Sequence, residues 1–507
     1  MISLDGHSLT LEQVASVARH KEEVDISPIG FENLCRSREW LNSILETGEP
    51  VYGINTGFGI FADRRIQRAE SARLSRNLIL SHAVCTGSPM PSDVVRAAML
   101  IRANALIRGH SGIRPEIVQS LLSMLNADLV PVIPSQGSLG SSGDLGPLSH
   151  LALVVSTDEK NLEEESGWAE YQGRIMSGKE AMYKAGISRI QLGPKEGLAF
   201  NNGATFSAAM GALAVWDAKY LFRVANTSLA LSLEALCGCS RAFDLRLHEA
   251  RGHPGQITVA STVMDLISGS TLVDSTNRVQ DAYSLRCAPQ VHGAILETIE
   301  FVSQIIQREI NAATDNPLLF EPGEAISGGN FHGEPVGLVM DYLGIAMAEL
   351  AAISERRVFR LTDEKLNGGL PAMLVDHAEA AGLNSGLMMP QYTAASLVLE
   401  NQTLAHPDSV HSLPTSGEQE DHNANSMTAA RHTWEIINNT AHVLAVELYT
   451  AARAIDLRKR MIPTGNLGKG TNIVYETVRN AIPYTPGDAW WEPEIEKVKN
   501  LIISRKI

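Results

Sequence analysis

The residues best suited to chemistry lie in a loop rich in glycine and serine that runs from Pro134 to His150, with Ser141-Ser142-Gly143 at its centre. Gly143 has no Cβ, so its backbone nitrogen can approach the Ser141 carbonyl in a bend that other residues cannot adopt. Attack by this nitrogen with loss of water would close a five-membered ring. Loss of the Ser142 hydroxyl as a second water would leave an exocyclic methylene, which is electrophilic. An isolated Ser-Ser-Gly is ordinarily a turn whose serines form hydrogen bonds with nearby backbone groups, so the triad alone does not show whether the ring forms.

The longer string around the triad, Gly-Ser-Leu-Gly-Ser-Ser-Gly-Asp-Leu-Gly-Pro-Leu-Ser-His over residues 137–150, resembles the signature of the aromatic amino acid ammonia-lyases and aminomutases. The resemblance implies that Ser141, Ser142 and Gly143 form 4-methylidene-imidazol-5-one (MIO) autocatalytically, and it implies no metal and no nucleotide cofactor. The family usually has Ala where this chain has Ser141. Because that side chain takes no part in the dehydration, we expect the ring to form.

Two further motifs precede this loop. Tyr52 opens Tyr-Gly-Ile-Asn-Thr-Gly-Phe-Gly, which resembles the family's first loop and implies that Tyr52 is the catalytic base. A phenolate can remove a weakly acidic β-proton if nearby positive charge or donors lower its pKa from about 10. His82 falls on a predicted helix, where a histidine usually belongs to the core or a cap. The resemblance implies that it contacts the far end of the substrate, and an imidazole suits a polar ring better than a phenyl.

Later motifs supply further candidates. Asn202 precedes Gly203, and the resemblance implies that its side chain holds the electrophilic ring. The run Val-Gln-Asp-Ala-Tyr-Ser-Leu-Arg-Cys-Ala-Pro-Gln over 279–290 is closely similar to histidine ammonia-lyases. It implies that Gln280 supports the ring, that Tyr283 is a second catalytic tyrosine and that Arg286 binds the substrate carboxylate, for which a guanidinium offers two parallel hydrogen bonds.

The segments at 312–317 and 327–335 are two more family signatures, and the second implies that Phe331 lies against the ring or the substrate. In the last motif, Gln-Glu-Asp-His at 419–422 is followed by Asn-Ala-Asn before Ser-Met, which is two residues longer than the family pattern. Counting forward from Leu413 makes Glu420 the substrate-facing residue, whereas counting back from Ser426 makes it His422. We favour Glu420, because Gln-Glu-Asp-His is intact.

Long helices must position these residues. Apolar residues recur at helical spacing and often cover more than one face, which favours buried long helices in a bundle. We expect a mainly α fold, similar to the fumarase and aspartase superfamily, with a smaller mixed N-terminal region. We divide the chain into an N-terminal region with the ring-forming loop, a long-helix bundle and a C-terminal cap, over 1–200, 201–460 and 461–507. The predicted helices cover 9–20, 65–86, 91–110, 115–127, a segment from about 145, 205–237, 284–311, 335–361, 391–404 and 427–458.

The composition limits the class of protein. The 507 residues carry 42 Lys and Arg against 57 Asp and Glu, a net charge of −15 that argues against a general nucleic-acid surface. Five scattered cysteines without zinc-site spacing are typical of reduced thiols in a cytoplasmic protein. No signal peptide and no uninterrupted apolar segment of about 20 residues is visible, so we expect no membrane contact.

We therefore expect an MIO-dependent lyase that converts L-histidine to trans-urocanate and ammonia. The resemblance also implies a homotetramer whose active sites combine residues of three subunits. A tyrosine or phenylalanine ammonia-lyase, an aromatic 2,3-aminomutase, an enzyme that eliminates trimethylamine from a histidine betaine, and an inactive helical scaffold remain alternatives. The chain lacks the Gly-Ser-Ser-x-Met-Pro-x-Lys signature of fumarase-type lyases, so we set that activity aside.

Overall fold

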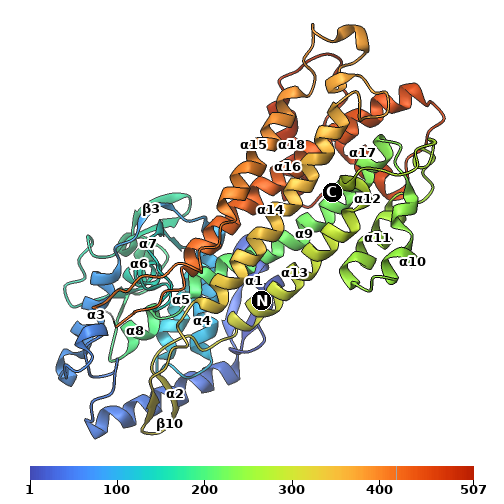
Figure 1. Ribbon diagram of the computed structural model, residues 1–507. Helices are drawn as coiled ribbons and strands as arrows, with labels where there is room; N and C mark the ends of the chain where they lie inside the picture. Colours follow the sequence, from blue (N-terminus) through green and yellow to red (C-terminus); the bar gives the residue numbers. More distant parts are fainter. Residues whose placement is uncertain (418) are drawn as a thin grey trace. The chain divides into compact units, whose positions relative to one another are not determined.

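The computed structural model describes residues 1–417 and 419–507, which are mainly helical with short strands (Figure 1). The predicted mainly α class is therefore confirmed. The strands form small pairs and one three-stranded sheet, rather than a central sheet.

The chain forms two compact units of three segments each. Unit 1 comprises Met1–Trp216, Val302–Asp341 and Pro407–Arg431, and unit 2 comprises Asp217–Phe301, Tyr342–His406 and His432–Ile507. This division differs from the three consecutive ranges predicted, because four of the five unit boundaries fall inside long helices, while the fifth, between His406 and Pro407, lies outside a helix. The helices concerned are α9 (Thr205–Ala235), α13 (Ala288–Glu309), α14 (Glu334–Thr362) and α16 (Ser426–Met461).

The N-terminal part of unit 1 begins with β1 (Ile2–Leu4), which pairs in parallel with β2 (Val24–Ile26). Between them, α1 (Leu11–His20) starts at a capping box, as the sequence Thr-Leu-Glu-Gln at 10–13 predicts, in which Thr10 and Gln13 each accept a hydrogen bond from the other's backbone N–H. The next helix, α2 (Pro28–Thr47), is not predicted by the sequence pattern. It is capped by Ser27 and has Pro28 in its first turn, where proline is tolerated.

Four helices form much of the remaining core of unit 1. They are α3 (Ser71–His82), α4 (Ser92–Ile107), α5 (Pro115–Asn126) and α6 (Leu145–Val155), all close to their predicted ranges. Every residue of α4 from Val94 to Ile107 is buried. Such burial on all sides explains why its apolar residues show no single face.

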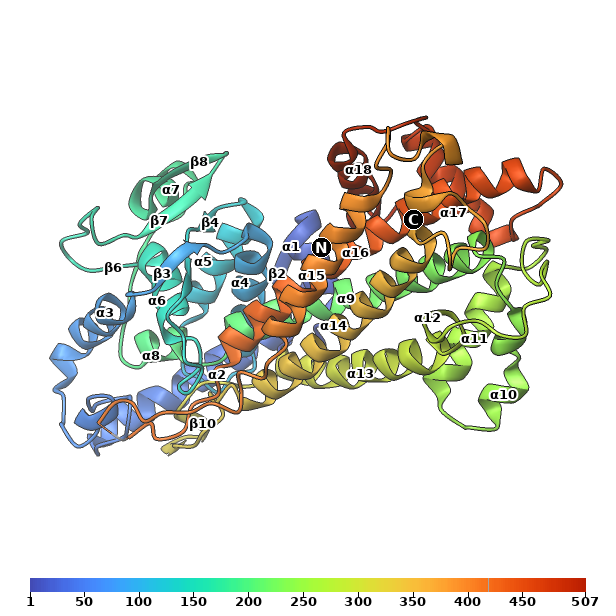
Figure 2. The ribbon, with the colours of Figure 1, turned by 45° about the horizontal axis from the view of Figure 1, so that its top comes forward.

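Residues 157–196 lack a long apolar stripe, which predicts an exposed excursion with both helix and strand. In the structure, β7 and β8 of this excursion join the earlier strand β4 in a three-stranded sheet in the order β4-β7-β8, beside a short helix α7 (Gly178–Lys184) (Figure 2). In addition, β6 and β9 form a parallel pair. These strands span Val130–Pro131, Trp168–Tyr171, Arg174–Ser177, Ser156–Thr157 and Ile190–Gln191. Two further antiparallel pairs are β3 (Thr86–Pro89) with β5 (Pro134–Gln136), and β10 (Leu318–Glu321) with β11 (Glu324–Ile326).

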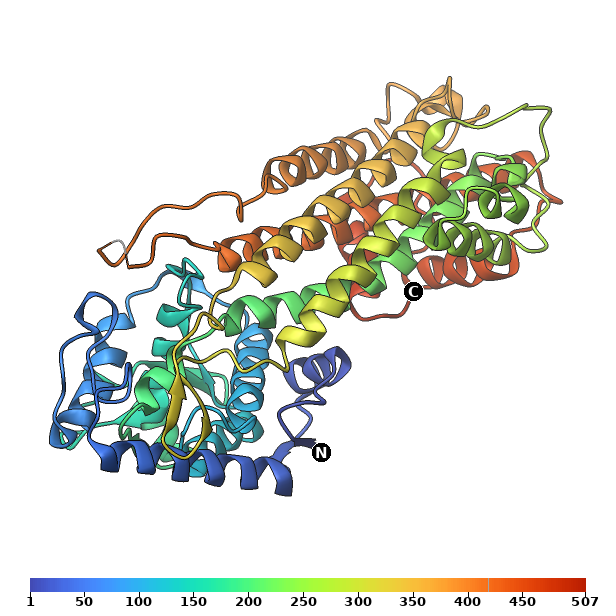
Figure 3. The ribbon, with the colours of Figure 1, turned by 60° about the horizontal axis from the view of Figure 1, so that its bottom comes forward.

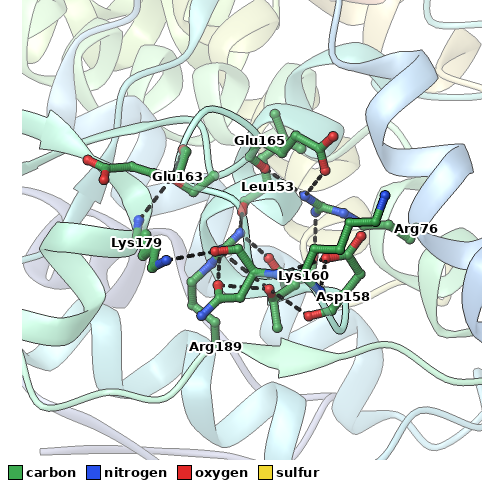
Figure 4. A network of polar contacts seen from close by, with 12 residues as sticks. Arg76, Leu153, Asp158, Lys160, Glu163, Glu165, Lys179 and Arg189 are labelled. Carbon is green, nitrogen blue, oxygen red and sulfur yellow. Dashed lines mark hydrogen bonds and ion pairs between the residues drawn. The ribbon is translucent and has the colours of Figure 1, made fainter.

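A polar network fastens this excursion (Figure 4). Arg189 and Lys179 each donate a hydrogen bond of 2.7 Å to Asn161, to its side-chain and backbone oxygens respectively. Arg76 donates to the Glu165 carbonyl at 2.7 Å. Burial, with a smaller contribution from the nearby Arg76 charge, lowers the pKa of Arg189 to about 10. The network therefore satisfies buried cations largely with neutral oxygens.

Unit 2 is built on segments of the four long helices, which lie along one another (Figure 3). The fully buried Glu447 on α16 accepts hydrogen bonds from Arg357 and Ser354 on α14, at 2.6 Å each, and from Ser232 on α9 at 2.8 Å. On α13, His292 lies 2.8 Å from the Asn226 amide oxygen of α9. These contacts fix the register of the helices inside the unit.

The other helices of unit 2 are α10 (Leu245–Glu249), α11 (Pro254–Leu266), α12 (Tyr283–Arg286), α15 (Met388–Leu404), α17 (Lys469–Ala481) and α18 (Trp491–Ile503). The glycines and proline after residue 460 predict an irregular C-terminal cap that ends in a short helix. The structure has that helix as α18, and α17 makes the region more helical than predicted. By length and composition, α14 could cross a membrane, but 67% of its most apolar window is buried within the protein, as in the core helix of a globular fold.

Candidate active site

A cavity of about 1310 Å³ in unit 1 collects most of the residues singled out in the sequence. Its walls come from the loop after α2, the end of α3, the triad loop and the loops near residues 316–332 and 416–422. The predicted site residues that line it are Tyr52, His82, Ser141, Ser142, Asn202, Phe331, Glu420 and His422.

The triad loop bends sharply against a second glycine. Gly143 has φ +77°, and a Cβ on it would lie 2.1 Å from the backbone carbonyl carbon of Gly203. The two glycines form a parallel bridge, and the Asp144 N–H donates to the Gly203 carbonyl at 2.9 Å. A side chain at residue 143 would collide with this backbone, so glycine is required for the approach of the two loops.

Asp144 anchors the loop to the start of α9. Its fully buried carboxylate accepts hydrogen bonds from Ser138 Oγ at 2.8 Å and from the N–H and Oγ of Ser207 at 2.8 and 3.0 Å. Burial raises the pKa of Asp144, and these donors oppose that rise. The loop therefore has a rigid support directly beside Gly143.

Both sides of Ser142 are held by other loops. Asn202 Nδ2 donates to the Ser142 carbonyl at 2.8 Å, and Ser142 Oγ donates to Glu420 Oε1 at 2.8 Å. Ser141 Oγ donates to the other carboxylate oxygen, Oε2, at 3.1 Å. With the Gly143 bend, these contacts fit the cyclised group, because the carbonyl of Ser142 becomes the ring carbonyl and its hydroxyl is the one expelled.

Glu420 and His422 occupy different places along the cavity wall. Glu420 contacts the triad, whereas His422 contacts His332. The two histidine rings stack with centroids 6.0 Å apart, and the backbone carbonyl oxygen of His422 lies 3.1 Å from His332 Nε2. Glu420 is also fixed by paired backbone hydrogen bonds with Thr415, at 2.8 and 3.2 Å. Of these two candidates, the geometry favours Glu420 as the residue that acts beside the triad.

His82 is the last residue of α3, and its tautomer follows from its contacts. Nδ1 lies 2.8 Å from the Leu78 carbonyl oxygen, which can only accept, so Nδ1 carries the hydrogen and Nε2 is an acceptor. Burial lowers the pKa of His82, while the Leu78 hydrogen bond and the Glu420 charge oppose that change. The ring is therefore neutral near pH 7.

Tyr52 lines the same cavity, but its surroundings disfavour the phenolate. Burial raises the pKa of Tyr52; a hydrogen bond with the Gly59 backbone opposes this rise, and the Glu420 charge reinforces it. The lowering that a phenolate base requires is thus not found among the described residues of unit 1. Arg64 also lines the cavity, but it is not among the groups that lower the pKa of Tyr52.

Phe331 lies in the cavity wall, next to a loop secured by Asn316. Asn316 Nδ2 donates to Ser327 Oγ at 3.2 Å, and Asn316 Oδ1 accepts from the Gly328 N–H at 2.7 Å. No role for Asn316 follows from the sequence beyond its place in a family signature. The apolar part of the wall, including Phe58, Leu74 and Leu198, also escapes prediction, because such residues look like ordinary core.

Three predicted site residues belong to unit 2 and are not among those that line the cavity. Tyr283 is 70% exposed, and the Arg286 guanidinium lies 4.6 Å from the centre of its ring. Arg286 Nε donates to the Asp281 carbonyl at 2.8 Å, and Gln280 immediately precedes Asp281. Within one chain, the structure therefore places Gln280, Tyr283 and Arg286 in a cluster of their own.

Among the described residues, no group of three or more His, Cys, Asp or Glu side chains is arranged to hold a metal ion.

Comparisons with known proteins agree over the whole chain. The family model described as aromatic amino acid lyase matches residues 9–480. A histidine ammonia-lyase of Caldanaerobacter subterraneus subsp. tengcongensis is 49% identical over 484 residues, covering 95% of this chain and 92% of the relative. The crystal structure of histidine ammonia-lyase from Trypanosoma cruzi superposes with a TM-score of 0.90 at 38% identity, covering 100% and 94% of the two chains. A tyrosine aminomutase from Streptomyces globisporus gives a TM-score of 0.92 at 34% identity, covering 100% and 97%.

Proposed function

Because the chain belongs to the aromatic amino acid lyase family, we propose that it is a histidine ammonia-lyase, which eliminates ammonia from L-histidine to give trans-urocanate. The observation that carries this proposal is that His82 and Glu420 line the same cavity as Ser141 and Ser142 of the triad. High identity to histidine ammonia-lyases over nearly the full length supports it.

His82 and Glu420 suit an imidazole substrate. His82 Nε2 and the Glu420 carboxylate both accept hydrogen bonds, and an imidazole ring offers one N–H donor when neutral and two when protonated. A phenyl ring offers none and forms no hydrogen bond with either acceptor, which forfeits about 0.5–1.5 kcal/mol for each bond not made. The site is therefore expected to select histidine over phenylalanine.

We propose that Ser141, Ser142 and Gly143 form MIO. When formed, this ring supplies the electrophile that makes the substrate's amino group a better leaving group. The Gly143 bend against Gly203 supports cyclisation, and Asn202 holds the carbonyl of the residue that becomes the ring's unsaturated carbon. Phe331 packs on the apolar side of the same cavity.

Tyr52 is the proposed base that takes the β-proton. Its raised pKa means that unit 1 alone leaves the phenol protonated near neutral pH, so additional positive charge is needed. Arg286 is the proposed source of that charge. It also binds the substrate carboxylate, with Tyr283 and Gln280 beside it to hold the ring and relay protons.

The proposed assembly is a homotetramer in which neighbouring subunits supply Gln280, Tyr283 and Arg286 to the cavity. The 70% exposure of Tyr283 leaves this cluster accessible to another chain. Large apolar side chains are also exposed along α14 and α15, an arrangement that association of identical chains would cover. Those residues are Leu338, Tyr342, Ile345, Met389, Tyr392 and Leu399.

A cytoplasmic location is proposed as well. All five cysteines are free, as expected for thiols in a reducing compartment.

The test is an ultraviolet assay of the purified protein with histidine, tyrosine and phenylalanine, combined with intact mass. A urocanate spectrum with histidine, and a mass lower by two waters than the sequence predicts, is the expected result. A β-amino acid product would identify an aminomutase instead. An unmodified mass together with no turnover on any of the three substrates would overturn the proposal in favour of an inactive scaffold.

A further inference from the structure

Ser141 stands where relatives of this family usually have alanine, and its hydroxyl is engaged. The residue is 5% exposed, and its Oγ donates to Glu420 Oε2 at 3.1 Å. The neighbouring Ser142 Oγ donates to Oε1 of the same carboxylate at 2.8 Å. Glu420 thus has one serine hydroxyl on each of its two oxygens before any cyclisation.

Ring formation removes only one of these two donors. The Ser142 hydroxyl leaves as water, which breaks its hydrogen bond and frees Glu420 Oε1. The Ser141 backbone enters the ring through its carbonyl carbon, but its side chain is unchanged. The hydrogen bond from Ser141 Oγ to Oε2 is therefore the one that remains after maturation.

From this asymmetry we infer that Ser141 is a positioning residue for Glu420. It holds Oε2 so that the vacated Oε1 faces the space in which the substrate's side chain binds. A carboxylate fixed before binding loses less conformational freedom when the ligand arrives, which strengthens binding. The Thr415 backbone already fixes the main chain of Glu420, so the Ser141 hydroxyl adds control of the side-chain torsions.

This inference rests on the proposed function, since it assigns Glu420 to the substrate's ring. It predicts a specific pattern in the kinetics. Glu420 is assigned to the substrate's ring and not to the C–N bond that breaks, so its loosening should act on ground-state binding and raise KM more than it lowers kcat.

The test compares wild type with Ser141→Ala and Ser141→Thr, each checked for ring content by intact mass. Alanine is the residue usual in the family, so the first variant should fold and cyclise. Loss of one hydrogen bond should lower kcat/KM for histidine about three- to tenfold, mainly through KM. Ser141→Thr keeps the hydroxyl and should restore most of the loss.

A double-mutant cycle with Glu420→Ala separates positioning from an effect on the ring itself. If Ser141 acts through Glu420, Ser141→Ala should change little when Glu420 is already removed. Where turnover of these variants is too slow to measure, the same cycle is obtained from calorimetric binding of trans-urocanate to the wild type, the two single variants and the double variant.

Two outcomes overturn the inference while leaving the proposed function standing: Ser141→Ala that is kinetically identical to an active wild type, or an equal loss with and without Glu420. A wild-type protein that does not act on histidine overturns the proposed function and this inference together.

Discussion

Gly143 and Gly173 offer a matched pair that tests the bend on which ring formation depends. Their φ angles are +77° and +72°, so alanine pays nearly the same backbone cost at either position, roughly 1–2 kcal/mol. At Gly173 an added Cβ meets nothing within 4 Å. At Gly143 it would lie 2.1 Å from the Gly203 carbonyl carbon and 2.4 Å from its oxygen.

The obstacle at Gly143 is backbone and cannot rotate away, unlike the end of a side chain. Moving it would also disturb the Asp144 N–H bond to the Gly203 carbonyl and the contact between Asn202 and Ser142. We expect Gly173→Ala to lower the free energy of unfolding by the backbone cost alone, about 1–2 kcal/mol, with full ring content. Gly143→Ala should lose at least twice as much stability, form no ring and show no lyase activity.

Denaturant unfolding gives the two free energies, and intact mass gives the ring content. The comparison needs both readouts, because a destabilised protein could still cyclise. A Gly143→Ala protein that matches Gly173→Ala in stability and has lost the mass of two waters would refute the requirement for close approach of the two glycines.

Three other predictions follow from separate contacts. Glu447→Ala leaves the fully buried Arg357 without its carboxylate partner and should lower the free energy of unfolding by about 3–5 kcal/mol. Ser232→Ala removes only one of several donors to Glu447 and should lower it by about 1 kcal/mol. Equal losses in the two variants would contradict the central role of the ion pair. His82→Leu removes the acceptor Nε2 and should lower kcat/KM for histidine by about 5- to 150-fold, whereas kcat/KM for phenylalanine should stay level or rise. Parallel losses on both substrates would show that His82 does not recognise the substrate's ring. Tyr52 can act as the base only when it is ionised, so kcat/KM should increase with pH up to the pKa that Tyr52 has in the assembly, and Tyr52→Phe should abolish turnover. A flat profile would mean that neighbouring subunits lower this pKa below the range measured, or that Tyr52 is not the base; activity retained in Tyr52→Phe would identify the second case.

Helices set by local signals were predictable from the sequence. The Thr10 capping box starts α1, and Pro115 lies at the first position of α5, as expected. By contrast, α2 is half exposed along its length and mixes polar with apolar residues, so its periodicity is weak. The compact units were not predictable either, because a helix pattern carries no information about where along its length the packing partners change.

Motif resemblance identified residues that the structure then brings together from distant parts of the chain. No local pattern links Gly143 with Gly203, or Ser141 with Glu420, which are 279 positions apart. Tyr283 and Arg286 belong to equally clear motifs, but the described single chain assigns them to the other unit. Proximity in an assembly of several chains is not encoded in the spacing of residues along one chain.

The segment in which the count leaves Glu420 and His422 as alternatives is held at its base by two asparagines. Asn423 pairs with the start of the segment, accepting from the Leu413 N–H at 3.1 Å and donating to Ser412 Oγ at 2.8 Å. Asn425 then donates its N–H to the Leu139 carbonyl at 2.8 Å, in the triad loop. These bonds hold Asn423 and Asn425 at the base of the segment, on the C-terminal side of His422. Glu420, which is bonded to the Thr415 backbone, contacts both serines of the triad, and this contact supports the prediction made by the forward count from Leu413.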